Sequence, residues 1–373
     1  MVTLVTLIMT RQPTILLLIP HLGGGGAERV MAQLSEHLDP EKYRVHLGLV
    51  TAKEPANIPL PSSVTVHALG ARRVRYGLVR IWRLVWKLRP DAILTGMAHL
   101  NLAVLLLRPF FPPATRVLVR QNGLPGATDA GLLSPLLYRV LYRRADAVIC
   151  QSDAMAGNLA LAAGSHARLH VLPNPLDLNA IRSRVEIPQN HWRGPGPHLL
   201  AIGRLAPEKG FDLLLRAMAL LRFEFPTADL TILGAGGEEP ALRALAGKLA
   251  LEKSVRFAGH VSDPEAWFSG ATLFVLSSLR EGMPNALLEA ASAGLPIVAA
   301  PALGGLCQLL AGKQGVWLAD HVSAVALARA IAGALNALGP GQRFQHAWIE
   351  EFRMERAIPR FEALIDTVLA ATP

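Results

Sequence analysis

Two stretches in the second half of the sequence combine charged side chains with residues that form loops. In IGRLAPEKGFD, Arg204 and Lys209 flank a proline-containing loop that directly follows a strand-like run. Two cations at the end of a strand can hold a diphosphate and neutralise charge on a phosphate leaving group. A pair of solvated surface cations is the alternative. The position of the two residues directly after a strand favours a phosphate clamp.

The stretch SSLREGMPNALLEA places glutamates before and after a predicted helix start. Pro284 suits the first helical position, so the amides of residues 283–287 would point at a ligand. Glu289 follows Pro284 by five residues, about 7.5 Å along a helix axis, which is the distance of a ribose from a bound diphosphate. Glu281 precedes the helix and can reach hydroxyl groups on the far side of the phosphates. The alternative, a solvated helix face, is disfavoured by the glycine and proline between the glutamates.

A run of four glycines, residues 23–26, lies where a strand-like run turns into a helical stretch. Without Cβ atoms, such a loop lets backbone amides approach a phosphate, although a tight turn alone would also use glycine. The dinucleotide fingerprint G-x-G-x-x-G fails here and again at residues 234–239. A nicotinamide or flavin enzyme is therefore disfavoured.

Short apolar runs alternate with stretches of helical length, and this alternation occurs twice along the chain. The first series of strand-like runs comprises residues 14–20, 45–50, 64–68, 92–94, 116–119 and 147–150. The second comprises residues 198–202, 230–233, 255–257, 273–276, 296–299 and 316–318. Alternation of this kind predicts doubly wound parallel sheets, here two in tandem. Residues 172–197 are rich in proline and asparagine and predict a linker.

Composition sets the class of protein and its environment. The 373 residues are 51% hydrophobic and 17% charged, which fits a folded chain of about two domains. Two cysteines are too few for a disulfide scaffold or a zinc site. We expect no membrane-spanning helix, because the longest apolar run is interrupted by Arg108, and no signal peptide at residues 1–9. These features predict a cytoplasmic protein.

Charge is distributed unevenly between the two halves. Residues 1–190 hold 21 Lys and Arg against 11 Asp and Glu, whereas the remainder hold 16 against 17. A basic first half indicates an anionic partner, unless the excess reflects a generally basic proteome. Residues 72–90 predict a basic amphipathic helix with tryptophans, typical of an anionic membrane surface, although a helix packed on a sheet gives the same pattern. Residues 108–116 and 136–146 add aromatic and basic side chains. No nucleic-acid-binding module is recognisable, so nucleic acid is not expected as a partner.

Taken together, these motifs resemble the retaining glycosyltransferases of family 4, also called glycosyl transferases group 1. The resemblance covers nearly the whole chain and rests on GGGGAERV, VLPNPLD, IGRLAPEKGFD, the stretch from LTILGAGGEE to RFAGHV, and REGMPNALLEA with two glutamates eight residues apart. It implies the α/β GT-B fold, with two Rossmann-like doubly wound domains facing a central cleft. We expect an N-terminal, acceptor-side domain over residues 1–190 and a donor-binding domain over 191–345. A C-terminal helix within 346–373 would pack back on the first domain.

The resemblance also assigns roles to individual residues. Arg204, Lys209 and Glu281 would carry the reaction, the two cations holding the donor diphosphate and Glu281 positioning the transferred sugar rather than attacking it. The residues expected to bind the donor are Gly24, Gly25, Arg204, Lys209, His260, Val261, Glu281, Gly282, Met283, Pro284, Asn285 and Glu289. The family usually acts without a metal, and no cofactor is expected here.

One departure from the family pattern concerns the first domain. Many members place a histidine at the end of a strand near the reacting sugar, whereas this sequence has VLVRQNG at that point. Arg120 and Asn122 could take its place, and His99 is another candidate, although a lone histidine is more often structural. These three are the acceptor-side candidates.

The sequence thus predicts a hexosyl- or N-acetylhexosaminyltransferase that needs no metal and retains the anomeric configuration. Its donor would be a nucleotide sugar, most readily a UDP-sugar, and its acceptor a lipid-linked or cell-envelope glycan. It would work peripherally on the cytoplasmic face of the inner membrane, in polysaccharide or lipopolysaccharide biosynthesis. The alternatives are a GT-B epimerase, a transferase with a soluble acceptor, and a two-domain binding protein without chemistry.

Overall fold

The chain forms two compact units in the computed structural model, which describes residues 11–23, 25–52, 60–123, 134–164, 168–185, 191–192 and 194–371. The first unit comprises Met1–Cys150, Leu159–Leu172 and Ile358–Pro373, and the second comprises Gln151–Asn158 and Pro173–Ala357. Residue 190, near which the sequence predicts the domain boundary, lies outside the described residues.

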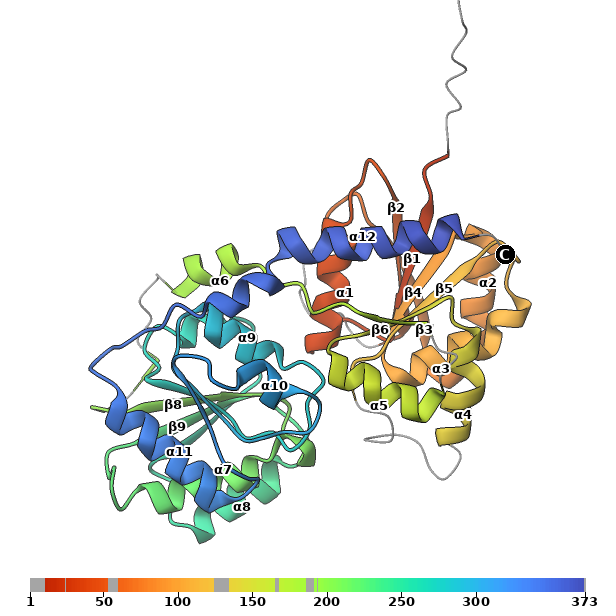
Figure 1. Cartoon of the computed structure of the whole chain (residues 1–373). Helices are drawn as coiled ribbons and strands as arrows, with labels where there is room; N and C mark the ends of the chain where they lie inside the picture. Colours follow the sequence, from red (N-terminus) through yellow and green to blue (C-terminus); the bar gives the residue numbers. More distant parts are fainter. Residues whose placement is uncertain are drawn as a thin grey trace, which may run out of the picture. The chain divides into compact units, whose positions relative to one another are not determined.

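The first unit is built on a parallel sheet of seven strands in the order β3-β2-β1-β4-β5-β6-β7 (Figure 1). The strands are β1 (Thr14–Ile19), β2 (Arg44–Thr51), β3 (Thr65–Ala71), β4 (Ala92–Gly96), β5 (Arg116–Arg120), β6 (Ala147–Cys150) and β7 (Leu169–Val171). Strand β1 is buried along its whole length, with Leu17 paired to Leu47 on one side and to Leu94 on the other. Continuous apolar strands are typical of parallel sheets, because helices cover both faces.

Helices connect these strands in the order that a doubly wound sheet requires. They are α1 (Gly26–His37), η1 (Val74–Tyr76), α2 (Leu78–Leu88), α3 (Ala98–Leu107), η2 (Arg108–Phe110), α4 (Ser134–Leu141), η3 (Tyr142–Arg144) and α5 (Asp153–Ala163), of which α5 belongs to this unit from Leu159 onward. The last helix, α12 (Met354–Ala370), contributes its residues from Ile358 onward to this unit. There the Tyr43 hydroxyl donates to Asp366 Oδ1 at 2.5 Å, which ties α12 to the loop before β2.

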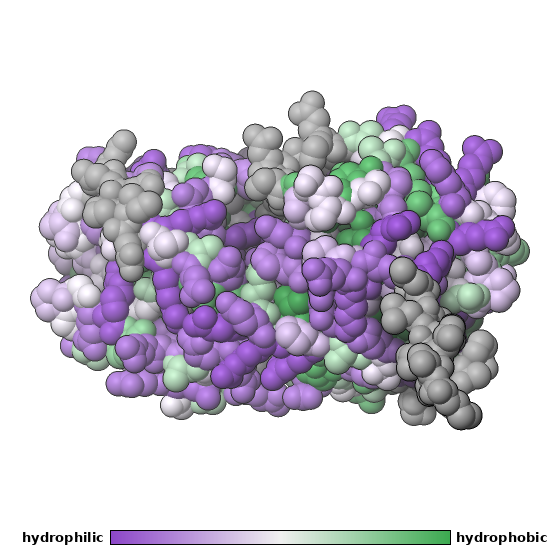
Figure 2. Space-filling model, turned by 90° about the horizontal axis from the view of Figure 1, so that it is seen from above, coloured by the Kyte–Doolittle hydropathy of each residue, from purple (hydrophilic) through white to green (hydrophobic). Residues whose placement is uncertain are grey.

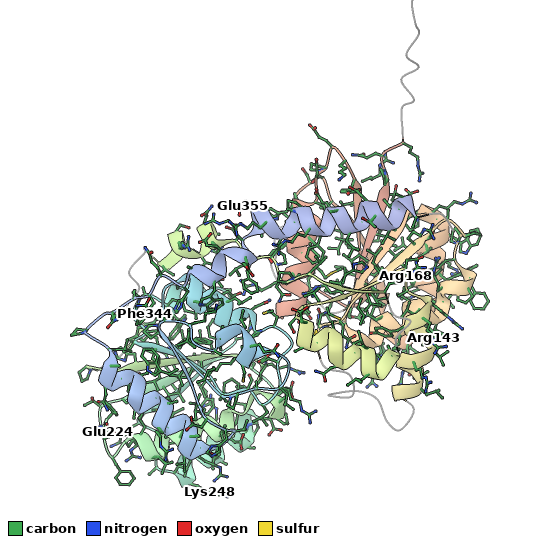
Figure 3. The ribbon with its side chains drawn as sticks, viewed as in Figure 1. Arg143, Arg168, Glu224, Lys248, Phe344 and Glu355 are labelled. Carbon is green, nitrogen blue, oxygen red and sulfur yellow. The ribbon has the colours of Figure 1, made fainter. Side chains whose placement is uncertain are left out.

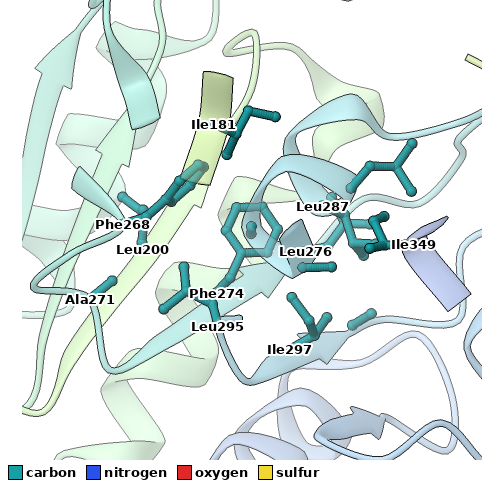
Figure 4. Close-up of a cluster of buried hydrophobic side chains, with 14 of the residues drawn as sticks. Ile181, Leu200, Phe268, Ala271, Phe274, Leu276, Leu287, Leu295, Ile297 and Ile349 are labelled. Atoms are coloured by element: carbon teal, nitrogen blue, oxygen red, sulfur yellow. The ribbon is translucent and has the colours of Figure 1, made fainter. Parts of the chain in front are cut away.

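The second unit repeats the architecture with six parallel strands in the order β10-β9-β8-β11-β12-β13. The strands are β8 (His198–Ile202), β9 (Asp229–Leu233), β10 (Val255–Gly259), β11 (Leu273–Leu276), β12 (Ile297–Ala299) and β13 (Val316–Leu318). The helices are α6 (Leu178–Val185), η4 (Pro207–Lys209), α7 (Phe211–Leu221), α8 (Glu239–Lys248), η5 (Pro264–Trp267), α9 (Asn285–Ser292), α10 (Leu306–Leu310), α11 (Ala324–Ala337) and η6 (Ala347–Phe352). A cluster of buried side chains on one face of this sheet packs Phe274 and Leu276 of β11 with Leu287 of α9 (Figure 4).

Both sheets have a point where the strand order reverses, between β1 and β4 and between β8 and β11. The loops that follow the carboxyl ends of strands at such points are where ligands of this architecture bind. The prediction of two doubly wound parallel sheets is therefore confirmed. The described helices include none that is long and apolar enough to cross a membrane.

The prediction of a linker over residues 172–197 is wrong in part, because these residues include helix α6. Leu178 and Ile181 of α6 are buried in the core of the second unit. The Asp177 carboxylate accepts a hydrogen bond from the Ala180 amide at 2.9 Å, which satisfies a backbone donor at the start of the helix. Two apolar residues three apart are enough to bury so short a helix, but too few to give a visible periodicity.

Candidate functional site

The carboxyl ends of β8 and β11 bring two predicted site residues into direct contact. Lys209 ends η4, the short helix after β8, and Glu281 lies in the loop after β11. Lys209 Nζ lies 2.6 Å from Glu281 Oε1, and the Ser278 hydroxyl donates to the same oxygen at 2.6 Å. The Glu281 side chain is only 8% exposed, so this pairing compensates a largely buried charge. Residues 72 positions apart in the sequence therefore form one charged unit.

Backbone contacts fix the turn that carries Lys209. The Ser277 hydroxyl donates to the Lys209 carbonyl at 2.9 Å, and the Leu279 amide donates to the Glu208 carbonyl at 2.9 Å. Gly210 follows with φ of +61°, and a Cβ added there would lie 2.3 Å from the Ser277 carbonyl oxygen. Only glycine fits at this position, which explains the Lys-Gly pair in the motif. The loops after β8 and β11 are thus joined before any ligand binds.

Arg204, the other predicted cation of the clamp, follows β8 directly. Its Nη2 donates to Glu208 Oε1, four residues further along. The Arg204 side chain is 66% exposed, whereas that of Glu208 is 24% exposed. Both cations of the clamp therefore carry a carboxylate partner, and the partner of Arg204 was not foreseen from the sequence.

Helix α9 begins one residue later than predicted. Pro284 has ψ of 96°, which is extended backbone, so it is the capping residue and Asn285 is the first helical residue. The side chain of Asn174 donates to Asn285 Oδ1, which anchors the VLPNPLD stretch to this helix start. Glu289 lies in the second turn of α9 and is buried.

The loop around Glu281 is held closely by residues after β12. The Glu281 amide donates to the Leu303 carbonyl at 2.8 Å. A Cβ added to Gly304, whose φ is +122°, would lie 1.7 Å from the Glu281 carbonyl oxygen. Gly282 and Met283, between Glu281 and the helix, are partly buried.

His260 and Val261 follow β10, two strands away from β8. His260 is exposed and Val261 is partly buried against the core of the unit. They therefore lie at the same edge of the sheet as the charged cluster, after a strand two positions away from β8.

In the first unit, the glycine loop follows β1. Gly24 lies outside the described residues. Gly25 caps α1, and a Cβ added to it would lie 2.1 Å from Glu28 Oε2. Glu28 is buried, with His21 Nδ1 3.6 Å from its Oε1. The carboxylate therefore packs against the loop, a role that the AER sequence after the glycines could have signalled, because acidic residues favour first helical turns.

Arg120 and Asn122 occupy the carboxyl end of β5, where Arg120 is fully buried and donates to Asn122 Oδ1. Burial lowers the pKa of Arg120 to about 10. Asn101 Nδ2 donates to the Arg120 carbonyl at 2.9 Å, and the Tyr142 hydroxyl donates to Gln121 Oε1 at 2.5 Å. Burial raises the pKa of Tyr142 well above its usual value. These side chains form a buried polar network that fixes the end of the strand.

His99, the other candidate in this unit, lies at the start of α3 after β4, and its side chain is exposed. Two residues earlier, Met97 has φ of +76°, an unusual conformation for a residue with a side chain. Backbone strain of this kind is concentrated at functional sites. Gly96, the last residue of β4, pairs with Arg120 of β5, so the two candidate positions follow neighbouring strands.

The part of the chain that the structure describes contains no group of three or more His, Cys, Asp and Glu side chains that could hold a metal ion.

Family models match both units of the chain. A model described as Glycosyltransferase Family 4 matches residues 24–180, and one described as Glycosyl transferases group 1 matches residues 196–337. The chain belongs to the family 4 glycosyltransferases of group 1. The resemblance drawn from the motifs is thus confirmed.

Relatives in this family include an uncharacterised glycosyltransferase of Haemophilus influenzae, 36% identical over 33% of this chain and 35% of its own. A second is N-acetylgalactosamine-N,N'-diacetylbacillosaminyl-diphospho-undecaprenol 4-alpha-N-acetylgalactosaminyltransferase of Campylobacter jejuni, 26% identical over 79% of this chain and 82% of its own. The matches to the first three curated relatives span 35%, 62% and 54% of the lengths of those relatives.

The fold is also that of solved family structures. HepE of Anabaena, solved in complex with UDP, superposes with a TM-score of 0.77, 18% identity, and coverage of 95% of this chain and 100% of HepE. The likeness confirms the GT-B fold for this chain.

Proposed function

We propose that this chain transfers a hexosyl or N-acetylhexosaminyl group from a UDP-sugar to a lipid-linked or cell-envelope glycan, with retention of configuration. The observation that carries the proposal is the charged cluster at the ends of β8 and β11, where Lys209 and Glu281 are 2.6 Å apart and Arg204 lies in the loop between β8 and η4. Cations, a buried carboxylate and a helix start at one sheet edge are the groups that a sugar diphosphate requires.

The two cations supply the electrostatic part of catalysis. Cleavage of the bond between sugar and diphosphate leaves negative charge on a phosphate oxygen, and prearranged cations lower the cost of that charge. Arg204 and Lys209 take this role in the proposal, which therefore needs no metal. The amides at the start of α9, residues 283–285, add partial positive charge on the same edge of the sheet.

Glu281 acts in the proposal as a positioning residue for the transferred sugar. One of its oxygens already receives the Ser278 hydroxyl and the Lys209 ammonium, so its charge is engaged and its nucleophilicity is low. The acceptor proton passes to the leaving phosphate oxygen on the same face, as the family resemblance implies, and configuration is retained without a covalent intermediate. Glu289 binds the ribose, and His260 and Val261 border the base.

The donor and acceptor classes draw support from the comparisons. HepE was solved with UDP, which favours a UDP-sugar donor. The Campylobacter jejuni relative is named for an undecaprenol diphosphate substrate, which favours a lipid-borne acceptor. Arg120, Asn122 and His99 are the acceptor-side residues in this proposal. The first unit is also the more basic one, and Arg143 and Arg168 are among its cations (Figure 3).

A membrane-facing surface on the first unit supports the same acceptor class. Helix α2 buries Ile81 and Val85, as a core helix must, but leaves the aromatic rings of Trp82 and Trp86 partly exposed. Both indole nitrogens donate to the Phe110 carbonyl, at 3.1 and 2.9 Å, and the Phe110 ring is 64% exposed. Hydrophobic patches interrupt a mostly hydrophilic surface in Figure 2.

Cations surround these aromatic side chains. Arg83, Lys87 and Arg89 of the same segment are exposed, and the Arg89 guanidinium lies 5.9 Å from the centre of the Trp86 ring. Aromatic rings beside cations fit the interface of an anionic membrane. We therefore place the protein peripherally on the cytoplasmic face of the inner membrane in this proposal.

Turnover of purified protein tests the proposed activity. UDP-glucose, UDP-galactose, UDP-N-acetylglucosamine and GDP-mannose would be supplied with undecaprenyl diphosphate-linked saccharide, with a chelator present throughout. We expect transfer from a UDP-sugar, an α-linked product by NMR, and loss of transfer in Lys209→Ala. Transfer only to water-soluble acceptors would contradict the proposed acceptor class. Epimerisation of the donor without transfer would contradict the transferase activity, and inversion of configuration would contradict the retaining mechanism.

Vesicle binding tests the membrane surface separately. The wild type should co-sediment with vesicles that contain anionic lipid, and a variant with both Trp82→Ala and Trp86→Ala should bind these vesicles several-fold less. Equal binding of both proteins would contradict this surface.

A further inference from the structure

The two cations of the clamp differ in how firmly their carboxylate partners hold them. Lys209 pairs with Glu281, which is largely buried and also receives the Ser278 hydroxyl. Arg204 pairs with Glu208 at a more open place, with exposed side-chain fractions of 66% and 24%. An exposed ion pair is weak and breaks easily. The Arg204–Glu208 pair is therefore the one that a ligand can exchange.

The position of Glu208 suits such an exchange. Its backbone is fixed, because its carbonyl accepts from the Leu279 amide and Glu208 itself lies in η4. Its carboxylate, in contrast, forms an ion pair with Arg204 and with no other cation in the part of the chain that the structure describes. Release of Arg204 consequently leaves a carboxylate that water can solvate, without disturbing the turn that carries Lys209.

A diphosphate is a stronger partner for arginine than one carboxylate. The planar guanidinium forms paired hydrogen bonds to phosphate oxygens, and a diphosphate brings more negative charge than Glu208. We propose that Glu208 is the exchangeable counterion of Arg204: it holds the guanidinium in the empty site, yields it to the diphosphate, and takes it back as the nucleoside diphosphate leaves. This inference rests on the proposed function.

The consequence is a lowered affinity for any diphosphate at this site. Glu208 competes with the ligand for Arg204. Lower affinity for the departing nucleoside diphosphate favours its release, which is a slow step in many enzymes. Glu208 is thus a residue that tunes affinity through Arg204 and makes no bond to the sugar.

The test is calorimetric titration with UDP of the wild type and of Glu208→Gln, which preserves size and removes the charge. We expect the dissociation constant to fall by about two- to five-fold, the range set by an exposed ion pair. The inhibition constant of UDP in turnover should fall by the same factor. The matched control is Glu239→Gln in α8, where Glu239 pairs with Arg243 at the same spacing of four residues and with similar exposure. That variant should bind UDP as the wild type does.

The Arg204→Ala background distinguishes exchange of the Arg204 counterion from electrostatic repulsion between Glu208 and the diphosphate. In that background, Glu208→Gln should no longer change the affinity. An equal gain with and without Arg204 would overturn the exchange, and so would unchanged or weaker binding in Glu208→Gln while the wild type binds UDP. Absence of any nucleoside diphosphate binding to the folded wild type would instead overturn the proposed function, and this inference with it.

Discussion

Lys209 Nζ lies 2.6 Å from Glu281 Oε1, so the cation predicted to hold the diphosphate and the carboxylate predicted to position the sugar form one ion pair. The Ser278 hydroxyl completes this unit. Because the pair is largely buried, each member depends on the other for its charge to be tolerated. Substitutions within the cluster therefore need readouts that separate binding, transfer and folding.

Glu281 and Glu289 should differ in which step they affect. Glu281→Gln should reduce kcat by about 10²-fold, the scale of a lost transition-state hydrogen bond, with little change in affinity for free UDP. Glu289→Gln should weaken UDP binding by about ten-fold or more, since the proposed charged hydrogen bond to the ribose would be lost. Steady-state kinetics and calorimetry on both variants check the split. Equal loss of UDP affinity in the two variants would contradict these roles.

Ser278 should act through Glu281. Removal of its hydroxyl in Ser278→Ala deletes one hydrogen bond to a buried carboxylate, at a cost of about 1–3 kcal/mol in free energy of unfolding. We expect kcat to fall several-fold while UDP affinity stays near that of the wild type. Ser278→Thr restores a hydroxyl and should recover much of kcat. If Ser278→Ala lowered only the stability and left kcat unchanged, Ser278 would have no positioning role.

Gly304 should tolerate no side chain. Its φ is +122°, and a Cβ would meet the Glu281 carbonyl oxygen at 1.7 Å, so Gly304→Ala must shift the Glu281 loop. We expect loss of transfer together with a lower free energy of unfolding. Gly312 is the control, because its φ is +67° but a Cβ there meets nothing within 4 Å. Gly312→Ala should cost about 1–2 kcal/mol and leave the specific activity unchanged. Similar behaviour of the two variants would contradict the close approach at Gly304.

Asp366 should make the stability of the first unit depend on acidic pH. Burial raises the pKa of Asp366, but hydrogen bonds from Lys42 and Tyr43 outweigh it and hold the pKa below its usual value. A lowered pKa in the folded state means that the stabilisation is present above about pH 4 and is lost as the pH falls through the folded value.

Denaturant unfolding at pH 7 and pH 3 measures this effect. Asp366→Asn should be less stable than the wild type at pH 7, and the difference should shrink at pH 3. Asp320→Asn is a suitable control, because the Asp320 carboxylate is 77% exposed and lies 3.9 Å from its nearest cation. A difference between wild type and Asp366→Asn that is the same at both pH values would contradict the ion pair.

The sequence predicted those parts of the fold that depend on local patterns. Continuous apolar runs located twelve of the strands, because buried parallel strands need such runs on both faces. Strand β7 (Leu169–Val171) was not predicted, because His170 interrupts its apolar residues and leaves no continuous apolar run. Helix α6 was missed since two buried residues give no periodicity.

The motifs likewise located Arg204, Lys209, Glu281 and the start of α9, but not their partners. The contact of Ser278 with Glu281 and that of Asn174 with Asn285 depend on side-chain rotamers and on loops brought together by the sheet. Spacing along the chain cannot reveal such contacts, and the Asn174–Asn285 pair spans 111 positions.

Binding of a nucleoside diphosphate to the second unit should depend on Lys209. Calorimetric titration of the wild type and of Lys209→Ala with UDP, GDP and ADP, without added metal, measures this dependence. We predict that UDP binds the wild type and that the folded Lys209→Ala variant loses this binding. Binding of UDP to Lys209→Ala with unchanged affinity, or no binding of any of the three nucleotides to the wild type, would contradict the proposed role of Lys209.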